Sequence, residues 1–237
     1  MKKRNFSLYI GIFLVSIILF LFLLSFVALP YEVDAMDTGN RFAEASRDHI
    51  LGTDQFGRDI YSRILVSTRS ALAVGVTSVF FGALVGLFIG AVAALSPKAV
   101  EVVVMRGVDA MMAFPGILSA MVLSAILGKG VMNASIAISF FMVPVFARLS
   151  YSMILENGKK GYVKAARSYG VSLPRLLVFH MLPDMLTRLV TQFSSSIGAA
   201  ILTESSLSFL GLGIQPPGAS LGLMLSAIAA AFMPSSY

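Results

Sequence analysis

The feature that most constrains this chain is an uninterrupted apolar run near its start. From Leu8 to Leu29 the chain has 22 residues without a charged side chain. At about 1.5 Å of rise per residue, a helix of this length crosses a hydrocarbon core of about 30 Å. The preceding MKKRN is basic like the start of a signal peptide, but the run is too long for a cleaved signal and no A-x-A site follows it. We therefore predict an uncleaved first helix with its N-terminus in the cytoplasm.

Four further charge-free runs are long enough to span a membrane, or nearly so: Ser70–Pro97, Ala110–Gly128, Val131–Ala147 and Leu189–Thr203. Hydrophobic residues make up 57% of the 237-residue chain and charged residues only 13%, which excludes an ordinary soluble domain. The sequence predicts an all-α polytopic membrane protein with five transmembrane helices and a partial sixth.

The partial sixth span is the apolar run Leu221–Met233, which follows a turn at Pro216–Pro217. Its 13 residues would make a helix of about 20 Å, which is short for a membrane core of about 30 Å. The closing PSSY adds no basic anchor. We expect either a truncated last span or a tail that lies in a cavity covered by a partner.

The distribution of basic residues sets the orientation. With the N-terminus inside, the inner segments 1–7, 96–109 and 148–188 hold 12 of the 18 Lys and Arg residues, and the outer segments 31–69 and 128–130 hold 6. Cytoplasmic loops of membrane proteins carry the excess of positive charge, so this orientation is favoured. The net charge of +6 fits such loops better than binding to nucleic acid, and the absence of cysteine excludes disulfides and cysteine metal sites.

One predicted cytoplasmic stretch, residues 164–183, reads KAARSYGVSLPRLLVFHMLP. Residues 162–169 favour a helix, and Gly170 suits the left-handed position just after a helix end. Ser172 can cap a second helix whose first turn contains Pro174. The pattern predicts two short helices at an angle. On physical grounds alone this segment is either a docking surface or an interfacial loop held by anionic headgroups.

The same stretch resembles the EAA loop of ABC importer permeases, in which Glu-Ala-Ala is followed by three residues, Gly, nine residues and Ile-x-Leu-Pro. Ala165, Ala166, Gly170, Leu182 and Pro183 are in register with that pattern. The chain departs from the pattern at two positions. Lys164 replaces the usual Glu, and His180 replaces Ile, as is common in the peptide/nickel branch.

Two other stretches resemble the same branch. HILGTDQFGRDIYSRILVSTRSAL, residues 49–72, is similar to the loop after the first helix in C-type permeases of dipeptide, oligopeptide and nickel importers. ESSLSFLGLGIQPPGASLGLML, residues 204–225, is similar to their late-chain signature. The resemblance implies a type I ABC permease fold, with an N-terminal helix and external loop over residues 1–69 and the permease transmembrane domain over residues 70–237.

This resemblance implies a coupling helix that sits in a cleft of a cytoplasmic ATPase subunit. The implied coupling residues are Lys164, Ala165, Ala166, Tyr169, Gly170, Leu182 and Pro183. The implied partners are a homologous permease, two ATP-binding cassette subunits and an external substrate-binding protein, with lipid around the spans and no nucleic acid. The sequence has no G-x-x-x-x-G-K-[ST] motif, so we expect a transport subunit without enzymatic activity or cofactor, and ATP hydrolysis in the partners.

The resemblance implies import of di- or oligopeptides, with nickel or a metal chelate as the alternative because the motifs do not separate these branches. An ion-coupled secondary transporter is a more distant alternative, and it would need titratable residues in mid-span and usually an internal repeat. A membrane-embedded enzyme would need paired acids or a Ser–His pair at membrane depth. The sequence shows none of these patterns.

Several residues within or beside the spans have two interpretations each. Polar residues on the fifth span either line the transport pathway or hydrogen-bond to their own helix. The pathway candidates are Ser194, Ser195, Glu204, Ser205 and Ser206. Gly82, Gly86 and Gly90 favour close helix packing over a substrate-lining role.

The charged residues at the predicted span ends and in the outer loop are also open to two interpretations. The carboxylates of Asp109 and Glu204 are more consistent with reaching the membrane interface than with a functional site in mid-span. Asp54, Arg58 and Asp59 favour a local salt-bridged turn over contact with a partner.

Overall fold

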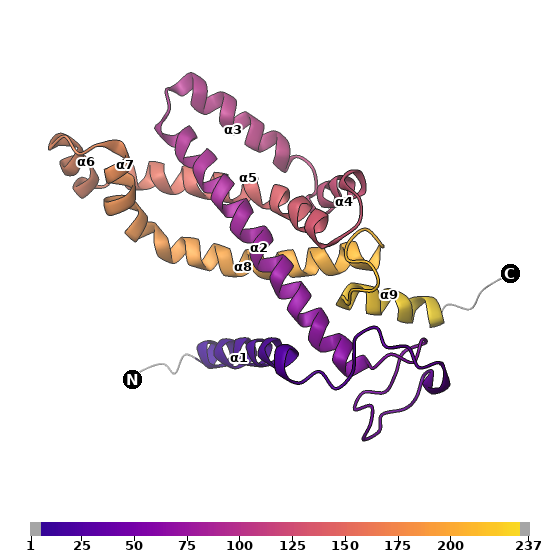
Figure 1. Cartoon of the computed structure of the whole chain (residues 1–237). Helices are drawn as coiled ribbons and strands as arrows, with labels where there is room; N and C mark the ends of the chain where they lie inside the picture. The colour runs from indigo at the N-terminus through magenta and orange to yellow at the C-terminus, as the bar shows by residue number, and fades with distance from the viewer. Residues whose placement is uncertain (1–5, 233–237) are drawn as a thin grey trace. The chain divides into compact units, whose positions relative to one another are not determined.

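The computed structural model describes residues 6–232, which form helices joined by turns and loops (Figure 1). The long helices are α1 (Phe6–Val27), α2 (Ile60–Leu95), α5 (Val131–Gly158) and α8 (Leu182–Phe209). The shorter elements are the 3-10 turn η1 (Thr38–Asn40), α3 (Lys98–Met112), α4 (Gly116–Leu127), α6 (Gly161–Ser168), α7 (Leu173–Leu176), the π-helical turn η2 (Leu177–Met181) and α9 (Leu221–Phe232). The helical architecture confirms the all-α prediction.

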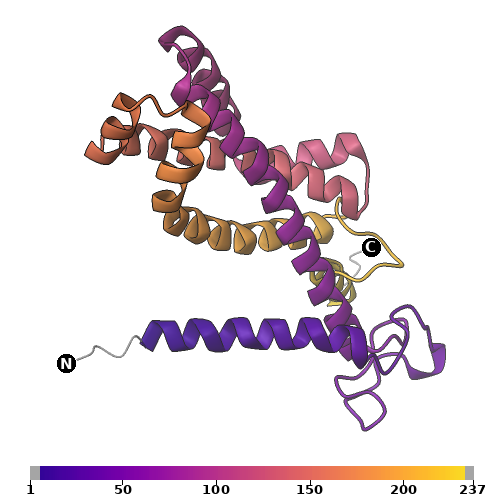
Figure 2. The ribbon, with the colours of Figure 1, turned by 60° about the vertical axis from the view of Figure 1, so that its left-hand side comes forward.

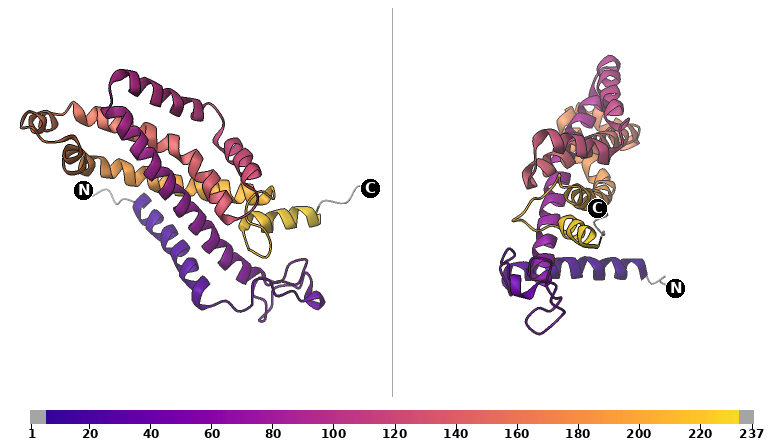
Figure 3. Two further views of the ribbon diagram at one scale, coloured as in Figure 1. Left: turned by 45° about the horizontal axis from the view of Figure 1, so that its top comes forward. Right: turned by 90° about the vertical axis from the view of Figure 1, so that its right-hand side faces the viewer.

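Three of the described helices are long and apolar enough to cross a membrane: Leu8–Val27 within α1, and the whole of α2 and α5. The helices α3 and α4 are long and apolar enough to cross a membrane only when they are taken together, and they meet at an angle of 86° (Figure 3). The predicted span Ala110–Gly128 is therefore not one continuous helix. The physical reason is Pro115, because the residue before a proline is disfavoured in the α conformation.

The helix α2 begins ten residues before the charge-free run Ser70–Pro97. Its first turn is capped by Asp59, whose Oδ2 accepts a hydrogen bond of 2.8 Å from the backbone N–H of Ser62. An aspartate at this position satisfies one of the free N–H groups of a helix start. Arg63 and Arg69 consequently lie inside the helix, in a segment that the charge pattern assigned to the outer loop.

The chain divides into two compact units, one of residues 74–204 and the other of the remaining segments at both ends. In the unit of residues 74–204, α2 packs on α5 through Gly82, Gly86 and Gly90. A methyl group added at these glycines would lie 2.5 Å from Cβ of Met142, 2.4 Å from the carbonyl oxygen of Val143 and 2.2 Å from that of Ala147, respectively. The three glycines therefore bring two backbones into direct contact, which confirms the packing interpretation.

Two hydrogen bonds join the same helices. The hydroxyl of Ser78 donates to the carbonyl of Ser135, and that of Ser150 donates to the carbonyl of Leu87, each at 3.1 Å. Such bonds between side chains and backbone contribute to helix association in lipid, where the hydrophobic effect between helices is weak.

The helix α1 is a single straight helix (Figure 2) whose apolar side chains are exposed around most of its circumference. Only 6% of the most apolar 18-residue stretch of α1 is buried by other parts of the chain. A helix that is apolar all round and exposed fits a lipid environment. The basic residues that set its predicted orientation belong to residues 1–5, which lie outside the described residues. The closing PSSY, residues 234–237, also lies outside them.

The contact between α2 and α5 predicts a large effect of one added methyl group. We expect Gly86→Ala to destabilise the detergent-solubilised protein by about 1–3 kcal/mol, because the methyl group overlaps the α5 backbone. The matched control is Gly107→Ala on α3, where nothing lies within 4 Å of the added carbon. We expect the control to be neutral or slightly stabilising. Thermal unfolding of both variants checks this, and equal melting temperatures would contradict it.

Candidate coupling loop and transport pathway

The helix α6 ends at Gly170 in a fully formed cap. Gly170 has φ of +77°, the left-handed conformation that the sequence predicts. Its N–H donates to the carbonyl of Arg167 at 3.0 Å, and the N–H of Val171 donates to the carbonyl of Ala166 at 3.3 Å. This pair of bonds is the Schellman arrangement, which fixes the direction of the chain as it leaves the helix.

The second helix of the predicted pair starts as expected but does not end as expected. Ser172 has the extended backbone of a capping residue and Pro174 lies in the first turn, although the Ser172 side chain makes no capping hydrogen bond. The helix then continues from α7 through η2 into α8 without a loop. The prediction of two short helices is therefore wrong for the second one, and Pro183 lies inside the first turn of α8.

Pro183 explains the π-helical turn that precedes it. Proline has no N–H to donate to the carbonyl four residues earlier, and its ring clashes with that carbonyl. The backbone widens here, so that the N–H of Leu182 donates to the carbonyl of Leu177, five residues back. Turns of this kind often occur at functional sites. Helical periodicity alone did not predict the turn.

A buried apolar cluster fixes the loop on the long helices (Figure 1 shows α6 and α7 at one end of α5). Its buried members are Met153 and Ile154 of α5 with Val163, Leu176, Met181 and Met185 of the following segments. Ala166 packs against this cluster, whereas Ala165 is exposed. The two alanines of the motif thus differ: Ala166 belongs to the interior, and Ala165 belongs to the outer surface of α6.

The remaining predicted coupling residues divide in the same way. Lys164 is exposed, and Tyr169 at the end of α6 is 89% exposed. Leu182 and Pro183 are also exposed and lie at the start of α8. The structure therefore brings together Lys164, Ala165, Tyr169 and Gly170 on one short helix and its cap, and it sets Leu182 and Pro183 on the next helix.

Two ion pairs join the end of α5 to the start of α8 at the base of this loop. Arg188 binds Glu156 through two nitrogens at 2.5 and 3.0 Å, and Lys160 pairs with Asp184. The hydrogen bond that Lys160 donates to the Asp184 carboxylate raises the pKa of Lys160 above its ordinary value. Sequence reasoning missed both pairs, because each joins residues that are more than twenty positions apart.

His180 lies in the π-helical turn, and within residues 6–232 its buried Nδ1 has no hydrogen-bond partner.

The pathway candidates on α8 lie in different environments. Ser194 is exposed and its hydroxyl donates to the carbonyl of Val190 at 2.9 Å, and Ser195 is exposed. Ser205 and Ser206 are half-buried. Glu204 is fully buried within the fold, and the expectation that its carboxylate reaches the membrane interface stays a prediction. Glu204 lies in the last two turns of α8, which ends at Phe209.

The other charged residues that the sequence singled out are paired. Asp109 forms an ion pair with Arg148 of α5, and both side chains are exposed. Asp54 accepts a hydrogen bond of 2.7 Å from Nε of Arg58 and also binds the backbone N–H groups of Phe56 and Arg58. This confirms the local salt-bridged turn. Asp59 instead caps α2 and binds Nδ1 of His49 at 3.0 Å, a pairing that the sequence did not predict.

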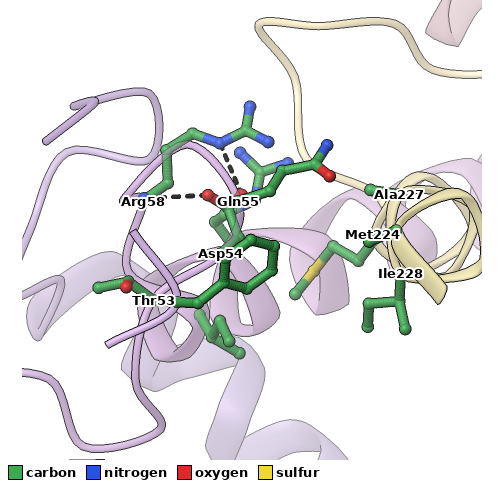
Figure 4. Close-up of a pocket in the computed structure, with 11 residues that line it drawn as sticks. Thr53, Asp54, Gln55, Arg58, Met224, Ala227 and Ile228 are labelled. Atoms are coloured by element: carbon green, nitrogen blue, oxygen red, sulfur yellow. Dashed lines mark hydrogen bonds and ion pairs between the residues drawn. The ribbon is translucent and has the colours of Figure 1, made fainter. Parts of the chain in front are cut away.

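That turn lines a cavity of about 220 Å³ together with α9 (Figure 4). Its lining includes Phe42, Thr53 and Ile60 together with Met224, Ala227 and Ile228 of α9. Asp54 and Arg58 are bonded to each other at its side (Figure 4), so the cavity offers mainly apolar surface.

Residues 82–235 match the family described as "Binding-protein-dependent transport system inner membrane component". The chain belongs to this family. It is also similar to the "Glutathione transport system permease protein GsiD" of Pectobacterium atrosepticum, with 38% identity over 94% of this chain and 74% of that protein.

Two further relatives agree with this assignment. The GsiD protein of an Escherichia coli strain is 36% identical over 95% of this chain and 74% of its own length. A "Putative peptide permease protein" of Brucella suis is 35% identical over 94% of this chain and 74% of its own length. The chain is thus a permease of an ABC importer in the peptide/nickel class, located in a membrane, and the resemblance drawn from its motifs is confirmed.

The cap at Gly170 predicts a specific pattern of tolerance in this permease. We expect Gly170→Val to destabilise the left-handed cap by about 1–2 kcal/mol, and Gly170→Asn to retain most of its stability, since asparagine tolerates this conformation. Limited trypsin cleavage at Arg167 and Arg175 measures loosening of the loop. The control is Gly161→Ala, where nothing lies within 4 Å of the added carbon. Equal cleavage of the Val and Asn variants would contradict the prediction.

Proposed function

We propose that this permease forms half of the translocation pore of an ATP-driven importer for short peptides. The observation that carries the proposal is the α6–α7 segment, which is fixed to α5 by its buried face and presents an exposed, capped helix on the other side. A permease without its own nucleotide motif needs such a surface to receive the energy of ATP hydrolysis from partner subunits.

The proposed coupling surface consists of Lys164, Ala165, Tyr169 and the Gly170 cap. Movement of an ATPase cleft around this surface would be carried to α8, because α7 and α8 are continuous through η2 and no flexible loop separates them. Ala166 holds the segment against the buried cluster, and Leu182 and Pro183 form the exposed start of α8 after the widened turn. The transport cycle is alternating access, in which ATP-driven closure changes the side on which the pore opens.

We place the pathway beside α8, with Ser194, Ser195, Glu204, Ser205 and Ser206 as candidate lining residues. Their support is composition, since polar groups within a span are usually kept for substrate or packing. The proposed topology keeps five spans and a partial sixth, with α8 as the fifth and α9 as the sixth, and the N-terminus in the cytoplasm. The proposed parts are the N-terminal helix with its external loop, residues 1–69, and the permease domain, residues 70–237.

The proposed substrate class comes from the relatives. GsiD proteins are named for glutathione, which is a tripeptide, and the Brucella relative is named for peptides. Short peptides therefore take first place, and nickel or a metal chelate remains the alternative. The complete importer would contain a homologous permease, two ATPase subunits and an external substrate-binding protein.

Substrate class is tested on the whole importer. Cells that carry the assembled system are given labelled glutathione, a labelled dipeptide or ⁶³Ni²⁺, and the external binding protein is titrated with each. We expect ATP-dependent uptake of a peptide and binding of the same peptide by the binding protein. Uptake of nickel alone would replace the peptide assignment, and uptake that follows an ion gradient without ATP would overturn the importer mechanism.

The different positions of Ala165 and Ala166 predict different failures. Ala165→Asp should leave the permease inserted at normal abundance and lower uptake at least about tenfold, a loss of about 1.4 kcal/mol of coupling. Ala166→Asp should lower abundance as well, because it places a charge against the apolar cluster. Ala165→Ser is the matched control. Normal uptake by a well-expressed Ala165→Asp variant would rule out this coupling surface.

A further inference from the structure

The α6–α7 segment carries more positive charge than its own acids neutralise. Between residues 156 and 188 the sequence has six Lys and Arg residues and two acids, Glu156 and Asp184. Both acids are occupied, because Glu156 binds Arg188 and Asp184 binds Lys160. Within residues 6–232 no acidic partner lies within ion-pair distance of the other four bases, which are Lys159, Lys164, Arg167 and Arg175.

These four unpaired charges are not spread evenly. The two ion pairs lie at the base of the loop, where α5 ends and α8 begins. Lys164 and Arg167 lie on α6 and Arg175 lies on α7, and all three side chains are exposed. We call these three residues the basic face. Lys159, the residue after α5, is the only one of the four at the base.

The side chains around the basic face suit a protein partner. Tyr169 is 89% exposed, Ala165 is exposed beside Lys164, and Leu173 is 43% exposed next to the cap. Exposed tyrosine and arginine are enriched at protein–protein interfaces. The Gly170 cap and the buried cluster hold this surface in one shape, which a partner can match but a fluid layer of headgroups does not require.

We propose that the basic face docks on an acidic groove of the ATPase subunit, so that charge complementarity selects the partner of this permease. The inference rests on the proposed coupling function and adds the chemistry of the partner. Like charges across an interface cost several kcal/mol and suppress wrong partners. An ATPase subunit whose groove is basic, as would suit a Glu in place of Lys164, would therefore pair poorly with this chain.

The test uses the permease assembled with its own ATPase subunits and purified through a tag on the permease. The double variant Lys164→Glu/Arg167→Glu should retain at least about tenfold less ATPase than the unmodified complex at about 0.1 M salt. Retention by the unmodified complex should fall between about 0.1 M and about 1 M salt, over which the Debye length decreases from about 10 Å to about 3 Å.

The control is Lys159→Glu, which reverses one charge at the base of the loop and is compared with Lys164→Glu alone, which reverses one charge on the basic face. Lys159→Glu should retain the ATPase, and the abundance of each variant in the membrane shows that it is folded and inserted. An Asp→Lys or Glu→Lys change in the ATPase groove that restores uptake to the double variant would support the charge match directly.

The outcomes separate the two proposals. Failure of the unmodified permease to retain ATPase subunits at any salt would overturn the proposed coupling function itself. Normal retention by the double variant, or retention that does not change with salt, would overturn only the acidic groove. Equal loss in Lys159→Glu and the double variant, reversed by added phosphatidylglycerol, would assign the basic face to anionic headgroups and also overturn the acidic groove.

Discussion

Direct contact between the backbones of α2 and α5 is the constraint on which the unit of residues 74–204 depends. Lipid offers little hydrophobic gain when two apolar helices meet, so close van der Waals packing must supply the attraction. Gly82, Gly86 and Gly90 allow this approach, and Ser78 and Ser150 add hydrogen bonds along the same line. The end of α5 is thereby fixed, and the α6–α7 segment is built upon that end.

The α6–α7 segment is held from within by apolar contacts and at its base by ion pairs. Val163 and Leu176 are nearly completely buried, although each lies in a short helix that would not be stable alone. Arg188 and Lys160 tie the two long helices on either side. The exposed side of α6 lies away from these buried contacts, so a partner can bind it without displacing them.

Much of the fold could be predicted from local patterns. The long charge-free runs predict α1, α2 and α5, and the residues around Gly170 predict the left-handed cap that the structure contains. The break in Ala110–Gly128 was missed, although Pro115 and Gly116 are visible in the sequence, because the apolar run outweighed them. The capping role of Asp59 is local, but the charge pattern assigned residues 31–69 to the outer loop and so placed the start of α2 too late. The burial of Glu204 depends on distant packing, and which alanine of the motif is turned inward depends on which side of α6 meets α5. No single-sequence pattern contains that information.

The π-helical turn has a consequence for how the two ends of the loop are oriented. One extra residue in a turn rotates everything beyond it by about 100° relative to a continuous α-helix. A helical wheel drawn through Leu173–Phe209 as one helix would therefore place the faces of α8 on the wrong side. Leu176 and Met185 both reach the same buried cluster although they lie nine residues apart, a spacing that a regular helix would put about 180° apart. The widened turn reconciles these two contacts, so it sets which side of α8 is turned inward.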